Sequence, residues 1–306
     1  MIAYAKKKAR KIQNCSFIVK FNFATKQLVW KNATGVAPYG LAIAQQKVFV
    51  TNWAGTTVID STQSTAGVPW GLAYTDALTG ATNNGTVSVF STAGKWIKEI
   101  KVGLHPNAII TAPSKNLIYV ANGSSDEISV INTQENKLIK NIPVGILGQD
   151  LQGSTPNALH LSNDGKKLFV SNGLDNAVVV YDLIKNKVEG LIPTEAFPAG
   201  IMIKNNHLIV ANLESDGANV VDSAKKARSI HQELASVSII PMPNQAQLNA
   251  YTAQVKRQNF LHKVAQWTLP ARTNIQPVPV PERLGEPSVF KHVVYIIKEN
   301  KTYDQV

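Results

Sequence analysis

Four segments of the chain repeat one pattern, and this repeat restricts the possible folds more than any other feature. Each copy holds a proline, an apolar strand pattern, a polar turn, a second apolar strand pattern and a closing asparagine. The copies are APYGLAIAQQKVFVTN (37–52), HPNAIITAPSKNLIYVAN (105–122), TPNALHLSNDGKKLFVSN (155–172) and FPAGIMIKNNHLIVAN (197–212). A hairpin repeated along a chain is typical of folds built from similar stacked units.

The spacing inside the repeat indicates that each hairpin is under a packing constraint. Sixteen positions separate Pro106 from Asn122, whereas fourteen separate Pro38 from Asn52. The shorter copies lose two residues at the turn, at Gln45–Gln46 and Asn205–Asn206. Because the side chains of a strand alternate between its two faces, a change of two residues keeps the same side chains inward.

Two further strand patterns follow the hairpin in most copies. The third strands are predicted at Gly85–Phe90, Glu127–Ile131 and Ala177–Tyr181, and the fourth at Trp96–Ile100, Leu138–Ile142 and Val188–Ile192. Four antiparallel strands that recur every 42–50 residues or so are the signature of a β-propeller blade. We therefore predict an all-β propeller of about four to five blades, the first of which, at Ser16–Trp30, lacks its first two strands.

Composition and charge exclude several classes of protein. No apolar run reaches the roughly 18 residues of a membrane helix, and the single cysteine, Cys15, excludes a disulfide framework. Five positive charges of the net +11 lie in a basic arm over residues 1–14. No apolar stretch follows them, so the arm does not match a secretory signal. The rest of the chain lacks the basic and aromatic pattern of a nucleic-acid binder.

Several stretches together resemble one known architecture, a YVTN-type β-propeller fused to an alkaline-phosphatase-like phosphoesterase. The strands VFVTN, IYVAN, LFVSN and LIVAN resemble the YVTN repeat. The resemblance extends to VTNW (50–53), VGLHPNA (102–108), GSTPNAL (153–159), NAVVVYDL (176–183), GLIPTEAFP (190–198) and SVSIIPMPNQAQLNAYTAQ (236–254). The final HVVYIIKENKTYDQV resembles the first strand and metal-binding turn of the phosphoesterase domain.

The residue patterns predict the insertion loop, the helix and the linker, and the resemblance implies the remaining domain organisation and the function. The propeller is expected over 15–243, with an insertion loop at 53–84. A helix and a proline-rich, extended linker are expected over 244–287, and the start of the phosphoesterase domain over 288–306. Members of the family have about seven blades, so the chain is expected to be a fragment that is truncated at both ends and inactive by itself. The parent protein, periplasmic or secreted, would hydrolyse phosphate esters, and the propeller would act as its scaffold or substrate gate.

Glu299 and Asn300 are the candidate metal ligands. They follow the apolar run Val293–Ile297, which predicts a buried strand, and a carboxylate beside an amide oxygen offers two ligands to a hard divalent cation. In the resembled family this turn binds a divalent metal in the intact parent; no cofactor is expected in the fragment, which lacks the nucleophile region. Lys301 stands where the family is expected to have arginine.

Other polar residues are interpreted as structural. His105 belongs to the LHPN turn, and Asn52, Asn122, Asn172 and Asn212 end equivalent strands, where asparagine bonds its own backbone in turns. Two alternatives to the phosphoesterase parent remain open. One is a propeller that binds a partner without catalysis, and the weaker one is a lactonase-like enzyme with a metal in its central channel. An incomplete ring is also expected to associate with itself through its open blade edges.

Overall fold

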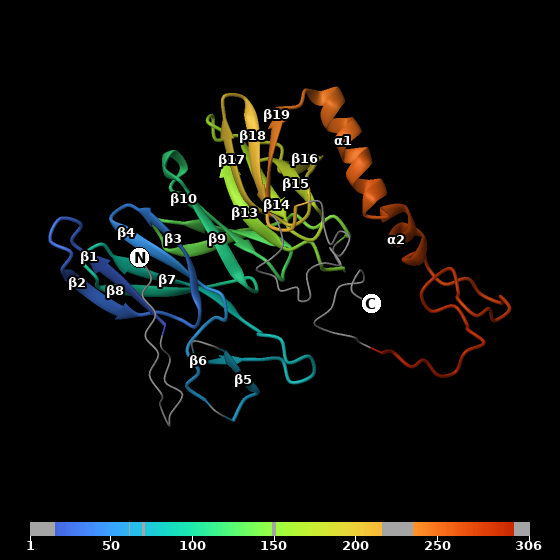
Figure 1. Ribbon diagram of the computed structural model, residues 1–306. Helices are drawn as coiled ribbons and strands as arrows, with labels where there is room; N and C mark the ends of the chain where they lie inside the picture. Colours follow the sequence, from blue (N-terminus) through green and yellow to red (C-terminus); the bar gives the residue numbers. More distant parts are fainter. Residues whose placement is uncertain (1–15, 61, 69–70, 149–150, 216–234, 297–306) are drawn as a thin grey trace, which may run out of the picture.

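The computed structural model describes residues 16–60, 62–68, 71–148, 151–215 and 235–296. Its strands form small antiparallel sheets that lie one beside the next along the chain, and the two helices follow the last sheet (Figure 1). The all-β propeller-type fold is thus confirmed. Neither described helix is long and apolar enough to cross a membrane.

Three sheets are complete four-stranded blades with their strands in sequence order. The first full blade holds β3 (Pro38–Ala44), β4 (Lys47–Asn52), β7 (Gly85–Ser91) and β8 (Trp96–Val102). The second holds β9 (Pro106–Ala112), β10 (Leu117–Asn122), β11 (Glu127–Asn132) and β12 (Lys137–Pro143), with a short 3₁₀ turn at Pro113–Lys115. The third holds β13 (Pro156–Leu161), β14 (Lys167–Asn172), β15 (Ala177–Asp182) and β16 (Lys187–Pro193).

Incomplete sheets flank these three blades. A partial blade consists of β1 (Phe17–Phe21) and β2 (Leu28–Ala33), as the sequence predicts. The last sheet holds three strands, β17 (Pro198–Lys204), β18 (His207–Asn212) and β19 (Ser236–Pro241). The predicted arc of blades is therefore present, and its last sheet has no fourth strand among the described residues.

The repeated spacing of proline and asparagine corresponds to a physical pairing. In each hairpin the proline lies directly opposite the closing asparagine: Pro38 opposite Asn52, Pro106 opposite Asn122, Pro156 opposite Asn172 and Pro198 opposite Asn212. In the two shorter copies the turn residues Gln45–Gln46 and Asn205–Asn206 all have φ between 48° and 59°. Two consecutive positive φ values are the mark of a type I′ turn, the tightest common hairpin connection.

Apolar side chains fill the spaces between neighbouring blades. Between the first and second full blades, Phe49 and Val87 pack against Ile118 and Ile131. Between the second and third, Ile128 and Val130 belong to one cluster with Leu168 and Val179. The middle strands of a full blade are therefore buried on both faces, which explains why their sequences are apolar at consecutive positions.

Two helices follow the last sheet. Helix α1 (Gln245–Gln258) was predicted, and Asn244 begins it with a capping box shared with Gln247. Its Leu248 and Val255 are buried against the third full blade and the last sheet. Gly190 on β16 allows this approach, because a Cβ there would lie 2.5 Å from Cγ of Leu248. The second helix, α2 (Leu261–Trp267), was not predicted.

The segment after the helices differs from the prediction in two ways. The proline-rich linker is not simply extended. The Arg272 guanidinium donates two hydrogen bonds, of 2.7 and 3.0 Å, to the buried Glu286 carboxylate. This ion pair closes residues 272–286 into a loop. The predicted strand Val293–Ile297 is wrong over its described part. Residues 293–296 belong to no strand and are 77–85% exposed, because no described segment pairs with them.

Candidate functional site

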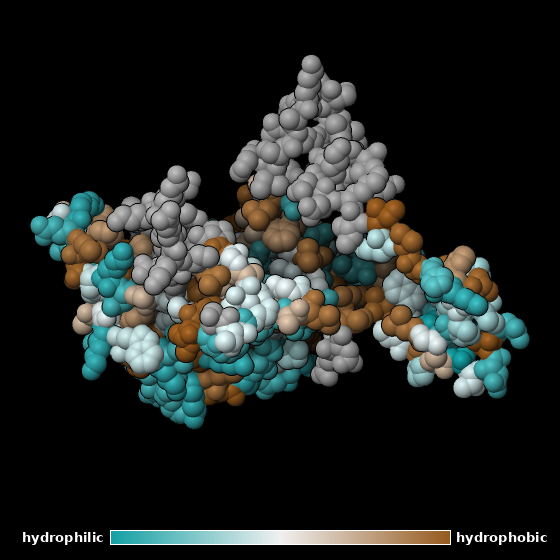
Figure 2. Space-filling model, turned by 90° about the horizontal axis from the view of Figure 1, so that it is seen from below, coloured by the Kyte–Doolittle hydropathy of each residue, from teal (hydrophilic) through white to brown (hydrophobic). Residues whose placement is uncertain are grey.

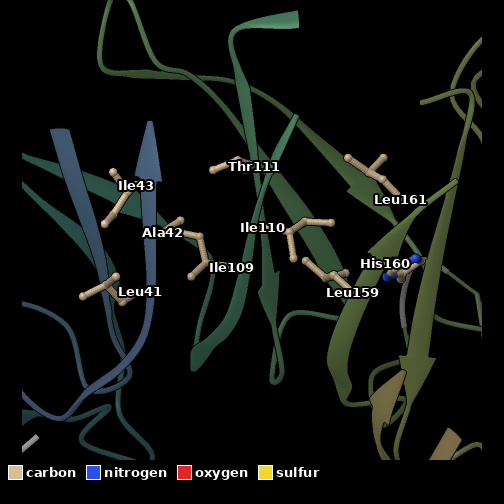
Figure 3. A pocket seen from close by; sticks show the side chains of 9 residues that line it. All are labelled: Leu41, Ala42, Ile43, Ile109, Ile110, Thr111, Leu159, His160 and Leu161. Carbon is tan, nitrogen blue, oxygen red and sulfur yellow. The ribbon is translucent and has the colours of Figure 1, made fainter. Parts of the chain in front are cut away.

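The inner strands of the three full blades line one hollow. Strands β3, β9 and β13 each contribute three consecutive residues to a cavity of about 380 Å³ (Figure 3). The inner strands are the strands that face the axis of a propeller, so this hollow corresponds to the wall of the central channel. Leu41 and Ile43 on β3 are 52% and 60% exposed there, since no inner strand of the partial blade covers them within the described residues.

The lining of the hollow is mostly apolar. It consists of Leu41, Ala42, Ile43, Ile109, Ile110, Thr111, Leu159, His160 and Leu161. Among these residues only His160 titrates near neutral pH, and burial lowers the pKa of its imidazole, which favours the uncharged form. A surface of this kind can hold an apolar ligand or peptide segment. Viewed from below, several patches of apolar side chains lie near the middle of the molecule, separated by more polar ones (Figure 2).

The four repeated asparagines are buried and hydrogen-bonded across strands. Asn52, Asn122, Asn172 and Asn212 are all 0% exposed. Asn122 Nδ2 donates to Ser129 Oγ on the next strand at 2.8 Å, and Asn212 Nδ2 donates to Ser238 Oγ at 2.9 Å. The interpretation of these residues as turn formers is therefore wrong: each asparagine joins the second strand of its blade to a neighbouring segment.

A carboxylate accompanies the asparagine in each of the three full blades, a feature that the sequence analysis missed. Glu99 accepts from Asn52 Nδ2 at 3.2 Å, and Asp175 accepts from Asn172 Nδ2 at 2.8 Å. Glu127 is the carboxylate beside Asn122, and burial raises its pKa. Burial raises the pKa of Asp175 to about 6, and the nearby Asp126 charge adds to this shift. The acids lie at different positions of their repeats, so an alignment of the copies does not reveal them.

His105 contacts both the insertion loop and the second full blade. Its ring stacks on Trp53 with centroids 3.8 Å apart, and its two nitrogens contact the hydroxyls of Thr82 and Ser124. Trp53 and Thr82 stand at the two ends of the insertion 53–84, which also contains a hairpin of β5 (Thr65–Val68) and β6 (Gly71–Tyr74). This arrangement agrees with the structural role predicted for His105.

The predicted metal ligands, Glu299 and Asn300, lie outside the described residues. Within the described part of the chain, no group of three or more His, Cys, Asp or Glu side chains is placed to hold a metal ion. Their assignment as metal ligands stays a prediction.

A match to a known family supports the propeller. Residues 98–246 match the family described as Lactonase, 7-bladed beta-propeller. Among solved structures, the chain is similar to the Kuenenia stuttgartiensis hydrazine synthase, with 20% identity and a TM-score of 0.47. That alignment covers 64% of this chain and 49% of the other, so the chain spans about half the length of that protein. No curated protein matches the sequence.

Proposed function

We propose that this propeller is the scaffold or substrate gate of a metal-dependent phosphoesterase, whose catalytic domain follows in a longer polypeptide. The observation that carries the proposal is the exposure of Val293, Val294, Tyr295 and Ile296, which are 77–85% exposed. Four consecutive apolar residues of strand-forming type are costly to leave in water. They suit the first strand of a further sheet, which is the role that the resemblance gives to them.

In this proposal Glu299 and Asn300 bind a divalent metal ion at the carboxyl end of that strand. Glu299 supplies negative charge and Asn300 a neutral oxygen, both of which hard cations prefer. The metal would polarise a phosphoryl oxygen of a phosphate ester. The apolar hollow on the inner strands gives the propeller a surface with which it can receive part of the substrate or of the catalytic domain. A periplasmic or secreted location belongs to the same proposal.

The test compares the 306-residue chain with a longer polypeptide that continues its reading frame. We expect the longer polypeptide to hydrolyse an aryl phosphate only with added divalent metal, and the 306-residue chain to show negligible turnover. Glu299→Gln keeps the shape of the side chain but removes its charge, so bound metal and turnover should both fall at least tenfold. Lys301→Arg, the control, retains the charge and should change neither. An unrelated downstream sequence, or full activity in Glu299→Gln, contradicts the proposal.

A lactonase-like activity is the second candidate, because residues 98–246 match a lactonase propeller family. A pH-stat assay with simple lactones and divalent metal on the 306-residue chain tests it. Turnover that a chelator abolishes would favour this candidate over the scaffold. The absence of both lactone and phosphate-ester turnover, together with binding of a partner in the hollow, would favour a non-catalytic binding propeller.

A further inference from the structure

A second, polar pocket of about 190 Å³ lies beside the first full blade. It is bounded by Gly35 at the end of the partial blade, Thr56 at the start of the insertion, and Ser88, Trp96 and Glu99 from β7 and β8. It combines one carboxylate, hydroxyl groups and one large aromatic side chain. This composition differs from the apolar hollow, and the proposed function does not use it.

The carboxylate of Glu99 is held in place by neutral donors. Thr86 Oγ1 donates to its Oε1 at 2.5 Å, Ser88 Oγ donates to its Oε2 at 2.8 Å, and Asn52 Nδ2 donates to its Oε1 at 3.2 Å. Within the described residues Glu99 takes part in no ion pair. Its negative charge is therefore fixed in position at the pocket without a cationic partner from the described chain.

A bulge in β8 places Trp96 on the same side as Glu99. Residues three apart in a regular strand point to opposite faces. In β8, however, Lys98 pairs with Val89 while Trp96 pairs with Phe90, so one extra residue shifts the alternation. The Trp96 side chain lines the pocket and is 56% exposed, so a ligand can reach its ring.

The neighbouring blade provides an internal comparison. The second full blade has the same bulge and an equivalent network, in which Asn122 donates to Ser129 and Ser129 donates to Asn141. Leu138 and Asn141 occupy there the register positions of Trp96 and Glu99. In the second blade the carboxylate beside the asparagine comes instead from Glu127 on β11, at the register position of Thr86. The fourth strand of a blade therefore needs neither a charge nor an aromatic ring at these two positions. Among the three full blades, only the first has a carboxylate and an indole ring on the same face of its fourth strand.

We propose that this pocket binds a small organic ammonium ion, such as the trimethylammonium group of choline. The carboxylate attracts the positive charge, and the face of an indole ring binds quaternary ammonium groups through cation–π attraction. The volume suits a compact head group rather than a large ligand. The same chemistry is offered by a free cation and by the head group of a choline lipid.

Calorimetric titration with choline tests the site, and 3,3-dimethyl-1-butanol serves as the uncharged isostere. We expect choline to bind at least tenfold more tightly than the alcohol. Glu99→Gln and Trp96→Leu, the latter copying the residue of the neighbouring blade, should each weaken choline binding at least tenfold. Trp267→Leu replaces a comparably exposed tryptophan on α2 and should leave it unchanged. Circular dichroism confirms that each variant is folded, and because Trp96 is exposed its replacement spares the core.

Sedimentation with phosphatidylcholine vesicles separates the two sources of the ligand. Binding of free choline without binding to vesicles identifies a soluble cation, whereas vesicle binding that depends on Glu99 and Trp96 identifies the lipid head group. The proposal is overturned if neither choline nor vesicles bind, if the alcohol binds as tightly as choline, or if folded Glu99→Gln and Trp96→Leu bind choline like the unchanged chain.

Discussion

Two buried carboxylates, those of Asp175 and Asp126, accept hydrogen bonds that join separate segments of the propeller. Asp175 is 4% exposed, and its carboxylate accepts a hydrogen bond from the Asn172 side chain. Its backbone carbonyl accepts another from the side chain of Asn259, at the end of α1. Asp126, also buried, accepts the backbone N–H groups of Gly153, Ser154 and Thr155. Two buried carboxylates that act on each other make stability depend on pH.

Asp175→Asn should remove one component of that pH dependence. The folded-state pKa of Asp175 is about 6, against an ordinary value of 3.8. Between these pH values the folded chain keeps a proton that the unfolded chain releases, so stability falls as pH rises through this window, by roughly 3 kcal/mol. Denaturant unfolding at pH 4, 5, 6 and 7 should show this decrease in the unchanged chain and not in Asp175→Asn. The exposed-site control Glu135→Gln should keep it, and a decrease of equal size in all three proteins would contradict the assignment.

The residue before each repeated proline has a conformation that the sequence did not reveal. Ala37, His105, Thr155 and Phe197 have φ between 52° and 56°, in the left-handed region. Each carbonyl accepts an N–H from the residue after the paired asparagine, for example Gly123 N–H to His105 O at 3.0 Å. This contact joins positions sixteen or eighteen residues apart, so local preference does not predict it.

At the scale of elements, α1 covers the outer strand of the third full blade and stabilises the end of the described propeller (Figure 1). The Thr252 hydroxyl accepts the Leu191 N–H at 2.9 Å, and Gly190 leaves room for Leu248. The helix thus fits only where β16 has no side chain.

Gly190→Ala should push α1 away from β16. The added Cβ would lie 2.5 Å from Leu248 Cγ and 2.8 Å from Thr252 Oγ1, and such overpacking costs about 1–3 kcal/mol. Hydrogen exchange over residues 245–258 should accelerate, and the free energy of unfolding should fall by that amount. Gly200→Ala is the matched control, since its Cβ would meet only Ala211 at an ordinary 3.6 Å. Equal behaviour of the two variants would show that Gly190 is not needed for helix docking.

The strands and α1 could be predicted from sequence because their signals are local. Strands with apolar residues on both faces, and Leu248, Tyr251 and Val255 at helical spacing, keep their pattern within one element. The short α2 and the hairpin within the insertion offer too few residues for such a pattern. The Glu99 and Asp175 networks join residues from different strands, so only the folded chain brings them together.

At the scale of the molecule, both ends of the arc expose apolar sheet faces. Met202, Val237 and Ile239 are 46–65% exposed on the last sheet, and Leu41 and Ile43 are exposed at the other end. In the third full blade, Val178 and Val180 occupy the register positions of Val237 and Ile239 and are buried. Neighbouring blades therefore stabilise one another, and the two outer faces have no such cover within the described residues.

We expect the purified 306-residue chain to associate as its concentration rises. Burying a side chain such as Ile239 is worth about 1.5–3 kcal/mol, which favours contact between the uncovered faces. Sedimentation velocity over a hundredfold concentration range should show this association, and Ile239→Lys should reduce it. Leu78→Lys changes an equally apolar residue that is 93% exposed on the insertion and should have no effect. A monodisperse monomer at every concentration would exclude association through the open faces.

Hydrogen exchange at Val293–Ile296 is the decisive test of the proposal that this segment becomes the first strand of a further domain in a longer polypeptide. In the 306-residue chain these amides should exchange as fast as unprotected peptide, while those of β10 and β14, paired on both edges, exchange slowest. In the longer polypeptide we expect strong protection of Val293–Ile296. Rapid exchange of these amides in both proteins would contradict it.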